Sequence, residues 1–283
     1  MMDKSKINIL VAGLTRDSDK TLQAEINKIS LALQGFKEVH WLIIESDSSD
    51  RTLSILEKLK HTKKNFEYAA LGNLTHEYPI RSPRVAFCRN YYIREINNNS
   101  KYSNIDYVVM ADLDGLNTEI TQSGIDSCWE RHDWDVCTAN QDGPYYDIWA
   151  LRHEYICPND SWKEYDFYKT TLKLDEYNSL DKSIAKRMIK IESKLDWIEV
   201  DSAFGGLAIY KKDILQNCSY EGTYKDGTPI CEHVPFHQQL KKRGHRIFIN
   251  PRLINAKSTE HTKILRPHKK MLRFILNFFN LRR

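Results

Sequence analysis

Residues 106–115 read Asp-Tyr-Val-Val-Met-Ala-Asp-Leu-Asp-Gly, and the interpretation of the whole chain depends on this stretch. Its apolar run, 107–111, has the length of one buried β-strand. Side chains two positions apart point the same way at a strand end, so Asp112 and Asp114 can face one ligand together. Two hard oxygen ligands suit Mg²⁺ or Mn²⁺, which commonly take further ligands from phosphate and water. The stretch is equally consistent with an ordinary turn, because Asp and Gly both favour turns.

The segments before this stretch alternate between strand-like and helix-like patterns. Residues 7–14 and 40–45 are apolar runs typical of buried strands, whereas residues 18–34 and 53–59 carry apolar side chains at helical spacing. This order predicts a parallel sheet. Ligands of such sheets bind beyond the carboxyl ends of the strands. The acids that follow the first two strands are therefore expected near a ligand, and they are Asp17, Glu45, Asp47 and Asp50.

The second strand runs into the sequence Leu-Ile-Ile-Glu-Ser-Asp-Ser-Ser-Asp-Arg-Thr, residues 42–52. This segment resembles the second strand of family 2 and related glycosyltransferases of the GT-A fold. In that family, acids of the segment hydrogen-bond the base and ribose of a nucleotide-sugar. The resemblance gives this role to Glu45 and Asp47. Capping of the following helix is an alternative role for Asp47 and Asp50.

Residues 81–92, Arg-Ser-Pro-Arg-Val-Ala-Phe-Cys-Arg-Asn-Tyr-Tyr, predict the start of a helix. They resemble the R-x-x-x-x-R-N element of the same glycosyltransferases, whose arginine faces the diphosphate. The matching residues are Arg84 and Arg89, and the arginine fork suits phosphate. A strand and D-x-D after such a helix favour the metal interpretation. Asp114 is then expected to contact the metal directly, and Asp112 to contact the metal, a metal-bound water or the ribose.

Two segments further along the chain extend the resemblance. Residues 142–152 follow a Y-Y-D-x-W-A-x-R pattern that resembles cryptococcal capsule-associated mannosyltransferases, and their aromatic and carboxylate groups suit sugars. Residues 200–210 resemble the family's F-G-G-x-A-x-Y segment. There Gly205 and Gly206 allow close backbone approach to a ligand, although a β-bulge requires the same residues. Residues 153–199 show no catalytic spacing and are expected to shape an acceptor pocket or a lid.

Residues 231–251 resemble the family's E-D-x-x-x-x-x-R-x-x-x-x-G-x-x-I pattern, in which inverting members use the aspartate of E-D as general base. Here the pair is Glu232-His233. Either residue is able to take a proton, so the base and the stereochemical outcome stay open. Many GT-A enzymes also have a late histidine that completes the metal shell, and the resemblance makes His261 the candidate.

The bulk composition limits the class of protein. The 283 residues, 41% of them hydrophobic, suffice for one large α/β domain or two small ones. The six cysteines form no C-x-x-C pair, which argues for reduced thiols in a cytosolic protein and against a zinc site. Positive charge is concentrated in residues 257–283, which hold eight Lys/Arg and one acid, so the body is not expected to bind nucleic acid.

Residues 263–283 predict a basic amphipathic helix. It is too short and too charged to span a bilayer, but it suits the anionic surface of a membrane. An ordinary helix packed on the domain is the alternative. The predicted location is the cytoplasm, with peripheral attachment to the cytoplasmic face of a membrane through this helix.

These features predict one GT-A domain over residues 1–262, an α/β fold with a Rossmann-like, mainly parallel sheet flanked by helices. Residues 1–115 form the nucleotide-binding half and residues 116–262 the acceptor half, followed by the C-terminal amphipathic helix. The predicted function is transfer of a sugar from a UDP- or GDP-sugar to a hydroxyl of a glycan or lipid-linked acceptor. The reaction depends on Mn²⁺ or Mg²⁺ and serves the synthesis of surface polysaccharide or glycoconjugates.

Two alternatives remain. A sugar-phosphate nucleotidyltransferase shares the sheet, although residues 12–17 lack the Gly-rich loop that usually follows its first strand. A catalytically degenerate, membrane-docked binding protein of the same fold is suggested by the histidine at position 233.

Overall fold

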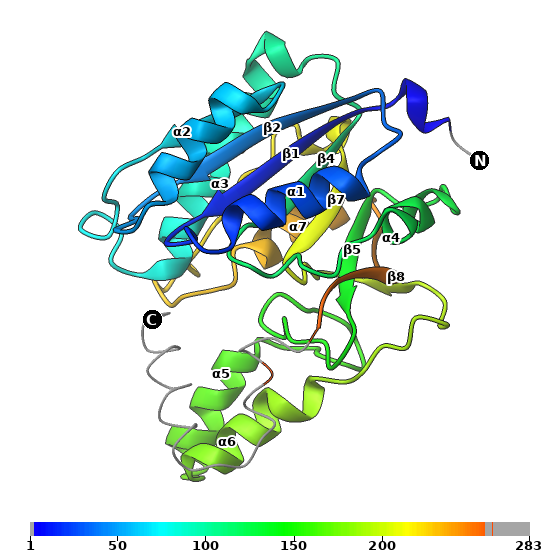
Figure 1. Ribbon diagram of the computed structural model, residues 1–283. Coiled ribbons are helices and arrows are strands. Elements are labelled where there is room, and N and C mark those ends of the chain that lie inside the picture. The colour runs from blue at the N-terminus through cyan, green and yellow to red at the C-terminus, as the bar shows by residue number, and fades with distance from the viewer. Residues whose placement is uncertain (1–2, 258–261, 263–283) are drawn as a thin grey trace.

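The structure is a computed structural model that describes residues 3–257 and residue 262. Its framework is an eight-stranded sheet with the order β3-β2-β1-β4-β7-β5-β8-β6 (Figure 1). Four neighbouring strand pairs are parallel and three are antiparallel, which confirms the predicted mainly parallel sheet. The strands are β1 (Asn8–Thr15), β2 (Glu38–Glu45), β3 (Phe66–Ala70), β4 (Tyr107–Asp112), β5 (Val136–Gln141), β6 (Ile198–Val200), β7 (Leu207–Lys211) and β8 (Ile247–Ala256).

Helices cover both faces of the sheet, which is why the central strands are apolar throughout. One core lies between the sheet and α1 (Leu22–Ala32), α2 (Thr52–Thr62) and α4 (Gln122–Asp126). The other lies between the sheet and α3 (Arg81–Asn98) and α7 (His233–Lys242). The helices predicted over residues 18–34 and 53–59 thus correspond to α1 and α2. Their apolar faces, Leu22, Ile26 and Ile29 in α1 for example, are fully buried.

The antiparallel strand β7 lies between β4 and β5 and joins the two halves of the sheet. Its first residues come next to the carboxyl end of β4, where the backbone N–H of Asp112 donates to the carbonyl of Gly206 at 3.0 Å. This crossing places the segment before β7 beside the D-x-D stretch.

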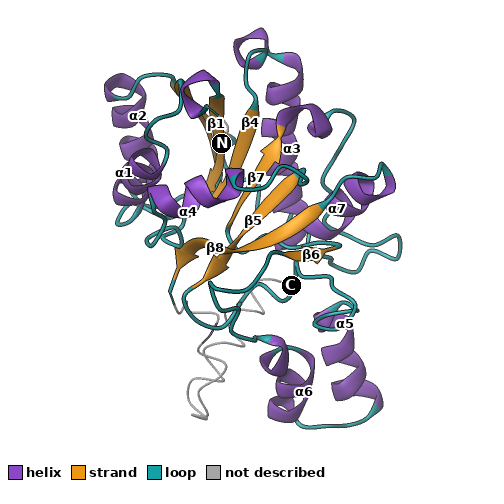
Figure 2. Ribbon diagram, turned by 90° about the vertical axis from the view of Figure 1, so that its right-hand side faces the viewer, coloured by secondary structure: helices purple, strands orange, loops and turns teal. Residues whose placement is uncertain are grey.

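A small helical unit, α5 (Ser161–Asp166) with α6 (Glu176–Ser183), stands apart from the sheet in both views (Figure 1, Figure 2). One π-helical turn, Phe167–Thr171, follows α5. Short 3-10 turns complete the described structure, at Lys4–Lys6, Ser100–Tyr102, Ser127–Trp129, Ala185–Arg187 and Lys212–Leu215.

The predicted C-terminal helix at 263–283 and the predicted metal ligand His261 lie outside the described residues. In the part of the chain that the structure describes, no helix has both the length and the apolarity needed to cross a bilayer.

Candidate active site

Arg89, in the middle of α3, is the centre of the candidate site. It is 1% exposed, and its guanidinium donates to three partners. Nε reaches Glu232 Oε1 at 2.9 Å, Nη2 reaches Asp112 Oδ1 at 2.7 Å and Nη1 reaches Tyr92 Oη at 3.1 Å. Burial alone would lower the pKa of Arg89, but the charges of Asp112 and Glu232 raise it well above the ordinary value. Arg89 therefore ties the end of β4 to the start of α7.

Glu25, on the buried face of α1, holds the loop that follows β4. Its carboxylate accepts the backbone N–H groups of Gly115 at 2.8 Å and Asn117 at 2.9 Å, and Asn117 Nδ2 at 2.7 Å. Asn117 Nδ2 also donates to the carbonyl of Asp112 at 2.8 Å. Burial raises the pKa of Glu25, and these hydrogen bonds oppose the rise. The position of Asp112 and Asp114 thus depends on a helix that precedes them by about 90 residues.

Gly205 and Gly206 have φ angles of 70° and 85°, which glycine adopts without strain. A Cβ atom on Gly205 would lie 2.8 Å from the carbonyl oxygen of Ala139 in β5, and one on Gly206 would lie 2.8 Å from Tyr146 Oη. The close contacts of these predicted ligand-binding glycines are therefore with the protein itself. They bring the amino end of β7 against β4 and β5, and their predicted contact with a ligand stays a prediction.

The turn that contains Gly205 also holds the side chain of Asp147 in the site. The backbone N–H of Gly205 donates to Asp147 Oδ2 at 2.9 Å. Burial raises the pKa of Asp147 to about 6, with a further contribution from the negative charges of Asp112 and Glu232. A carboxyl group that titrates near neutrality is well suited to proton transfer.

His233, the first residue of α7, is 2% exposed and stacks on Phe204 with ring centroids 3.9 Å apart. Both ring nitrogens lack a hydrogen-bond partner among the described residues. Nε2 is 3.6 Å from Glu232 Oε1, too far for a hydrogen bond. Burial lowers the pKa of His233 well below its ordinary value, so the ring is neutral at physiological pH. The structure thus brings Glu232 and His233 together with Asp112.

Two cavities meet at the D-x-D carboxylates. Cavity A lies at the carboxyl ends of β1 and β2 and is lined by Leu14, Thr15, Arg16, Ile44, Ser46, Arg81, Arg84, Val85, Cys88, Asp112 and Asp114. Cavity B lies on the other side of Asp112 and Asp114, toward α5 and α7. Its charged lining residues are Arg81, Arg89, Asp112, Asp114, Asp147 and Glu232, and its aromatic ones are Tyr146, Trp149, Trp162, Phe204 and His233.

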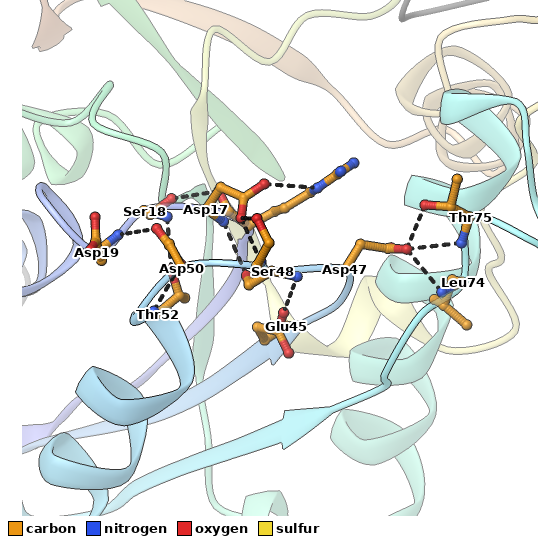
Figure 3. A network of polar contacts seen from close by, with 12 residues as sticks. Asp17, Ser18, Asp19, Glu45, Asp47, Ser48, Asp50, Thr52, Leu74 and Thr75 are labelled. Atoms are coloured by element: carbon orange, nitrogen blue, oxygen red, sulfur yellow. Dashed lines mark hydrogen bonds and ion pairs between the residues drawn. The ribbon is translucent and has the colours of Figure 1, made fainter.

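The acids at the end of β2 are not among the residues that line cavity A. Figure 3 shows the hydrogen bonds that they make. Glu45, 2% exposed, accepts the N–H of Ser48 at 2.9 Å. Asp47 Oδ1 accepts three hydrogen bonds, from the N–H groups of residues 74 and 75 and from the Thr75 hydroxyl. The predicted nucleoside-binding acids therefore hold backbone loops in this structure. Ser46, between them, is the residue of this turn that lines the cavity.

The arginines at the start of α3 differ in their surroundings. Arg84 donates to the Tyr78 carbonyl at 3.0 Å and lies 3.8 Å from Asp47. Arg81 is the first residue of α3 and lines both cavities, where the positive end of the helix dipole adds to its charge. A hydrogen bond from Ser82 Oγ to the carbonyl of Gly222, at 2.8 Å, anchors this end of the helix.

The residues of the site that the sequence analysis did not single out include Arg81, Asp147 and Glu25. Arg81 and Asp147 lie in segments that the sequence analysis singled out, but nothing local distinguishes them from their neighbours. Glu25 did carry a signal, because it is an acid on the apolar face of α1, between Leu22 and Ile26.

Asp112 and Asp114 fit a hard divalent cation that takes its other ligands from phosphate and water. The Asp112 side chain is 27% exposed, so one side of it remains open toward the cavities. Among the residues that the structure describes, no three His, Cys, Asp or Glu side chains are arranged so that they could hold a metal ion together. Within that part of the chain, Asp112 and Asp114 therefore stay the predicted metal ligands.

No protein-family model and no curated protein matches this sequence. Among solved structures, S. aureus TarS 1–349 superposes with a TM-score of 0.50 at 15% identity, over 97% of this chain and 66% of that chain. This match shows the fold, which is that of the GT-A glycosyltransferases, as predicted.

Two further solved structures resemble the chain at lower TM-scores. Mannosyltransferase PcManGT from Pyrobaculum calidifontis, in complex with GDP-Man and Mn²⁺, has a TM-score of 0.49 at 14% identity, over 88% of this chain and 56% of that one. Glucosyl-3-phosphoglycerate synthase from Mycobacterium tuberculosis has a TM-score of 0.42 at 10% identity, over 90% of this chain and 68% of that chain. The chain thus spans less than two thirds of TarS 1–349 and of PcManGT. None of the comparisons supports the resemblance to cryptococcal mannosyltransferases.

Proposed function

We propose that the chain is a glycosyltransferase that moves a sugar from a nucleotide-diphosphate sugar to an acceptor hydroxyl. The observation that carries this proposal is the meeting of cavities A and B at Asp112 and Asp114. Cavity A brings three arginines to these carboxylates, which suits a diphosphate. Cavity B is acidic and aromatic, which suits a hydroxylated acceptor. A sugar that leaves a diphosphate in A for a hydroxyl in B passes the D-x-D carboxylates.

Asp112 and Asp114 would hold Mn²⁺ or Mg²⁺, which when bound offsets the charge that develops on the leaving diphosphate. Other residues of the chain position these carboxylates and neutralise the leaving diphosphate. Glu25 and Asn117 keep the loop of these carboxylates in place. Arg81, at the junction of the cavities, neutralises the leaving group.

The acceptor proton goes to a carboxylate of cavity B in this proposal. The family pattern places its general base at the position of His233; Glu232 is the carboxylate next to it, and it accepts a hydrogen bond from Arg89. Asp147 is a second candidate, because its pKa of about 6 leaves it largely ionised at neutral pH and still a useful base. His233 is the weaker base of the predicted pair Glu232 and His233, because burial lowers the pKa of its ring.

The remaining parts of the proposal concern substrates and location. A UDP- or GDP-sugar is the donor, and a glycan or lipid-linked sugar is the acceptor, in surface polysaccharide or glycoconjugate synthesis. Residues 1–115 bind the nucleotide, with Glu45 and Asp47 near the nucleoside, and residues 116–262 bind the acceptor. His261 as a metal ligand and the helix at 263–283 as a membrane anchor remain predictions outside the described residues.

A donor-hydrolysis screen tests the proposal. The purified chain is incubated with UDP-, GDP- and CMP-sugars and Mn²⁺, with EDTA as the metal-free arm. We expect hydrolysis of one donor class, lost with EDTA and reduced at least 100-fold in Asp114→Asn. The control Asp196→Asn changes an exposed aspartate that lines neither cavity and should retain full activity. Full activity of Asp114→Asn would refute the assignment, and nucleotide-sugar binding without turnover would favour the degenerate binding protein.

A further inference from the structure

The aromatic lining of cavity B indicates the class of molecule that it takes. Tyr146 and Trp149 come from the loop after β5, Trp162 from α5 and Phe204 from the segment before β7. Their rings enclose one cavity although they lie up to 58 residues apart, the separation of Tyr146 from Phe204. Aromatic walls with a few placed polar groups are typical of sites for small organic ligands, and flat ring faces suit the apolar faces of a sugar.

The same wall carries buried polar atoms that have no hydrogen-bond partner among the described residues. They are Trp149 Nε1, Ser161 Oγ and the two ring nitrogens of His233. Ser161 and His233 are 0% and 2% exposed. Buried polar groups are nearly always paired in native structures, so these atoms indicate a missing partner. The indole only donates, whereas the hydroxyl and the neutral imidazole both donate and accept, and sugar hydroxyls match that mixture.

The charges of cavity B disfavour an anionic ligand. Its lining holds two arginines and four carboxylates. Arg89 is already engaged by Asp112 and Glu232, and Arg81 is shared with cavity A. A divalent cation at Asp112 and Asp114 would bring the wall to neutrality without giving it a positive surplus. A phosphate or carboxylate group on the acceptor would therefore be repelled by Asp147 and Glu232, and both arginines of the lining are already engaged or shared with cavity A.

We infer that cavity B binds an uncharged carbohydrate, whose hydroxyl groups pair with Trp149, Ser161 and His233 and whose ring packs on the aromatic wall. This inference deepens the proposed function and rests on it, because it names the acceptor class of the same site. Sugars that carry phosphate or carboxylate groups are poor acceptors.

Paired acceptors test the inference separately from the proposed function. Donor hydrolysis without acceptor reports on the donor site alone. With the donor that is hydrolysed, transfer is then measured to a panel of neutral glycosides and to the same glycosides carrying a 6-phosphate. We expect kcat/KM at least tenfold higher for the best neutral glycoside than for its phosphorylated counterpart. Equal or faster transfer to the phosphorylated form, or no transfer to any neutral glycoside by a protein that hydrolyses donor, would overturn the inference. The proposed function would survive either result.

Ser161→Ala provides a sharper variant, since Ser161 Oγ has no partner in the described residues and its removal breaks no internal hydrogen bond. We expect the KM for the neutral glycoside to rise about five- to tenfold, as for one lost hydrogen bond. The matched control is Ser183→Ala in α6, whose buried hydroxyl donates to the Ser179 carbonyl at 2.7 Å, outside the cavity. The control should lower thermal stability and leave the KM unchanged. Equal acceptor KM values in the two variants would contradict the assignment of Ser161.

Discussion

Replacing Arg89 by methionine tests whether this buried guanidinium holds the site together. Methionine replaces the aliphatic part of the side chain and removes the guanidinium with its charge, so Asp112 and Glu232 lose their common partner. Removing one member of a buried ion pair costs about 3–5 kcal/mol. Asp112 is 27% exposed and regains some hydration, whereas the Glu232 side chain is 5% exposed and does not. We therefore expect a loss of about 3 kcal/mol in the free energy of unfolding, the lower end of that range.

Urea titration and thermal unfolding measure this loss. For a domain of this size, about 3 kcal/mol corresponds to a melting temperature lower by roughly 6–12 °C. The control is Arg131→Met, which removes a guanidinium that also makes two hydrogen bonds to carboxylate oxygens, both of Asp133. That pair is 32% and 48% exposed, so its loss should cost at most about 1 kcal/mol.

Mn²⁺ binding gives the second readout for Arg89→Met. Loss of a positive charge beside Asp112 should tighten Mn²⁺ binding, measured by calorimetry, because the cation no longer competes with the guanidinium. If Arg89→Met is no less stable than Arg131→Met and binds Mn²⁺ with unchanged affinity, Arg89 is not the structural centre of the site. The predicted contact with the diphosphate would then explain the role of Arg89 better.

Two further predictions concern Glu25 and His237. Glu25→Gln should raise the Mn²⁺ concentration for half-maximal donor hydrolysis about tenfold. The reason is that the glutamine NH₂ group would face one of the loop N–H groups that donate to Glu25, so about one hydrogen bond is lost. An unchanged Mn²⁺ titration would contradict this. His237 is buried between Ser202 and Tyr210, and burial lowers its pKa to about 3. The unfolded chain therefore takes up the proton first, so stability is full above pH 6.5 and falls as the pH drops toward 3, by about 2 kcal/mol at pH 5. Urea titrations of His237→Gln at pH 7.5 and 5 should lack this contribution, and identical pH dependence of the two proteins would refute it.

The sequence predicted those parts of the structure that depend on local pattern. The apolar runs of β1, β2 and β4 and the helical spacing of α1 identified a parallel sheet, because burial on both faces requires such runs. The apolar run of β4 also placed Asp112 and Asp114 at its carboxyl end, whereas the position of Glu232 and His233 at the start of α7 followed from the family resemblance.

Contacts between distant segments could not be predicted in this way. Arg89 pairs with Glu232, 143 positions later, and the phosphate role that the family pattern suggests gives no hint of this partner. Arg81 reaches both cavities because Ser82 is anchored to Gly222, a contact that leaves no trace in local spacing. The insertion of β7 between β4 and β5 is likewise a property of the fold's connectivity, and it brings Asp147 into the site through Gly205.

The hydrogen bond from Asp112 to Gly206 has a consequence for how the site opens. Both cavities border one continuous sheet, and β4 and β7 are paired along residues 107–111 at their common boundary. The two halves therefore cannot swing apart like the lobes of a hinged enzyme without breaking central ladder hydrogen bonds. An opening motion of the site would instead involve peripheral segments without strands, such as residues 71–80 and 142–160. Amide hydrogen exchange should accordingly be slowest in β4 and β7, at the floor of the site, and fastest in these surrounding loops.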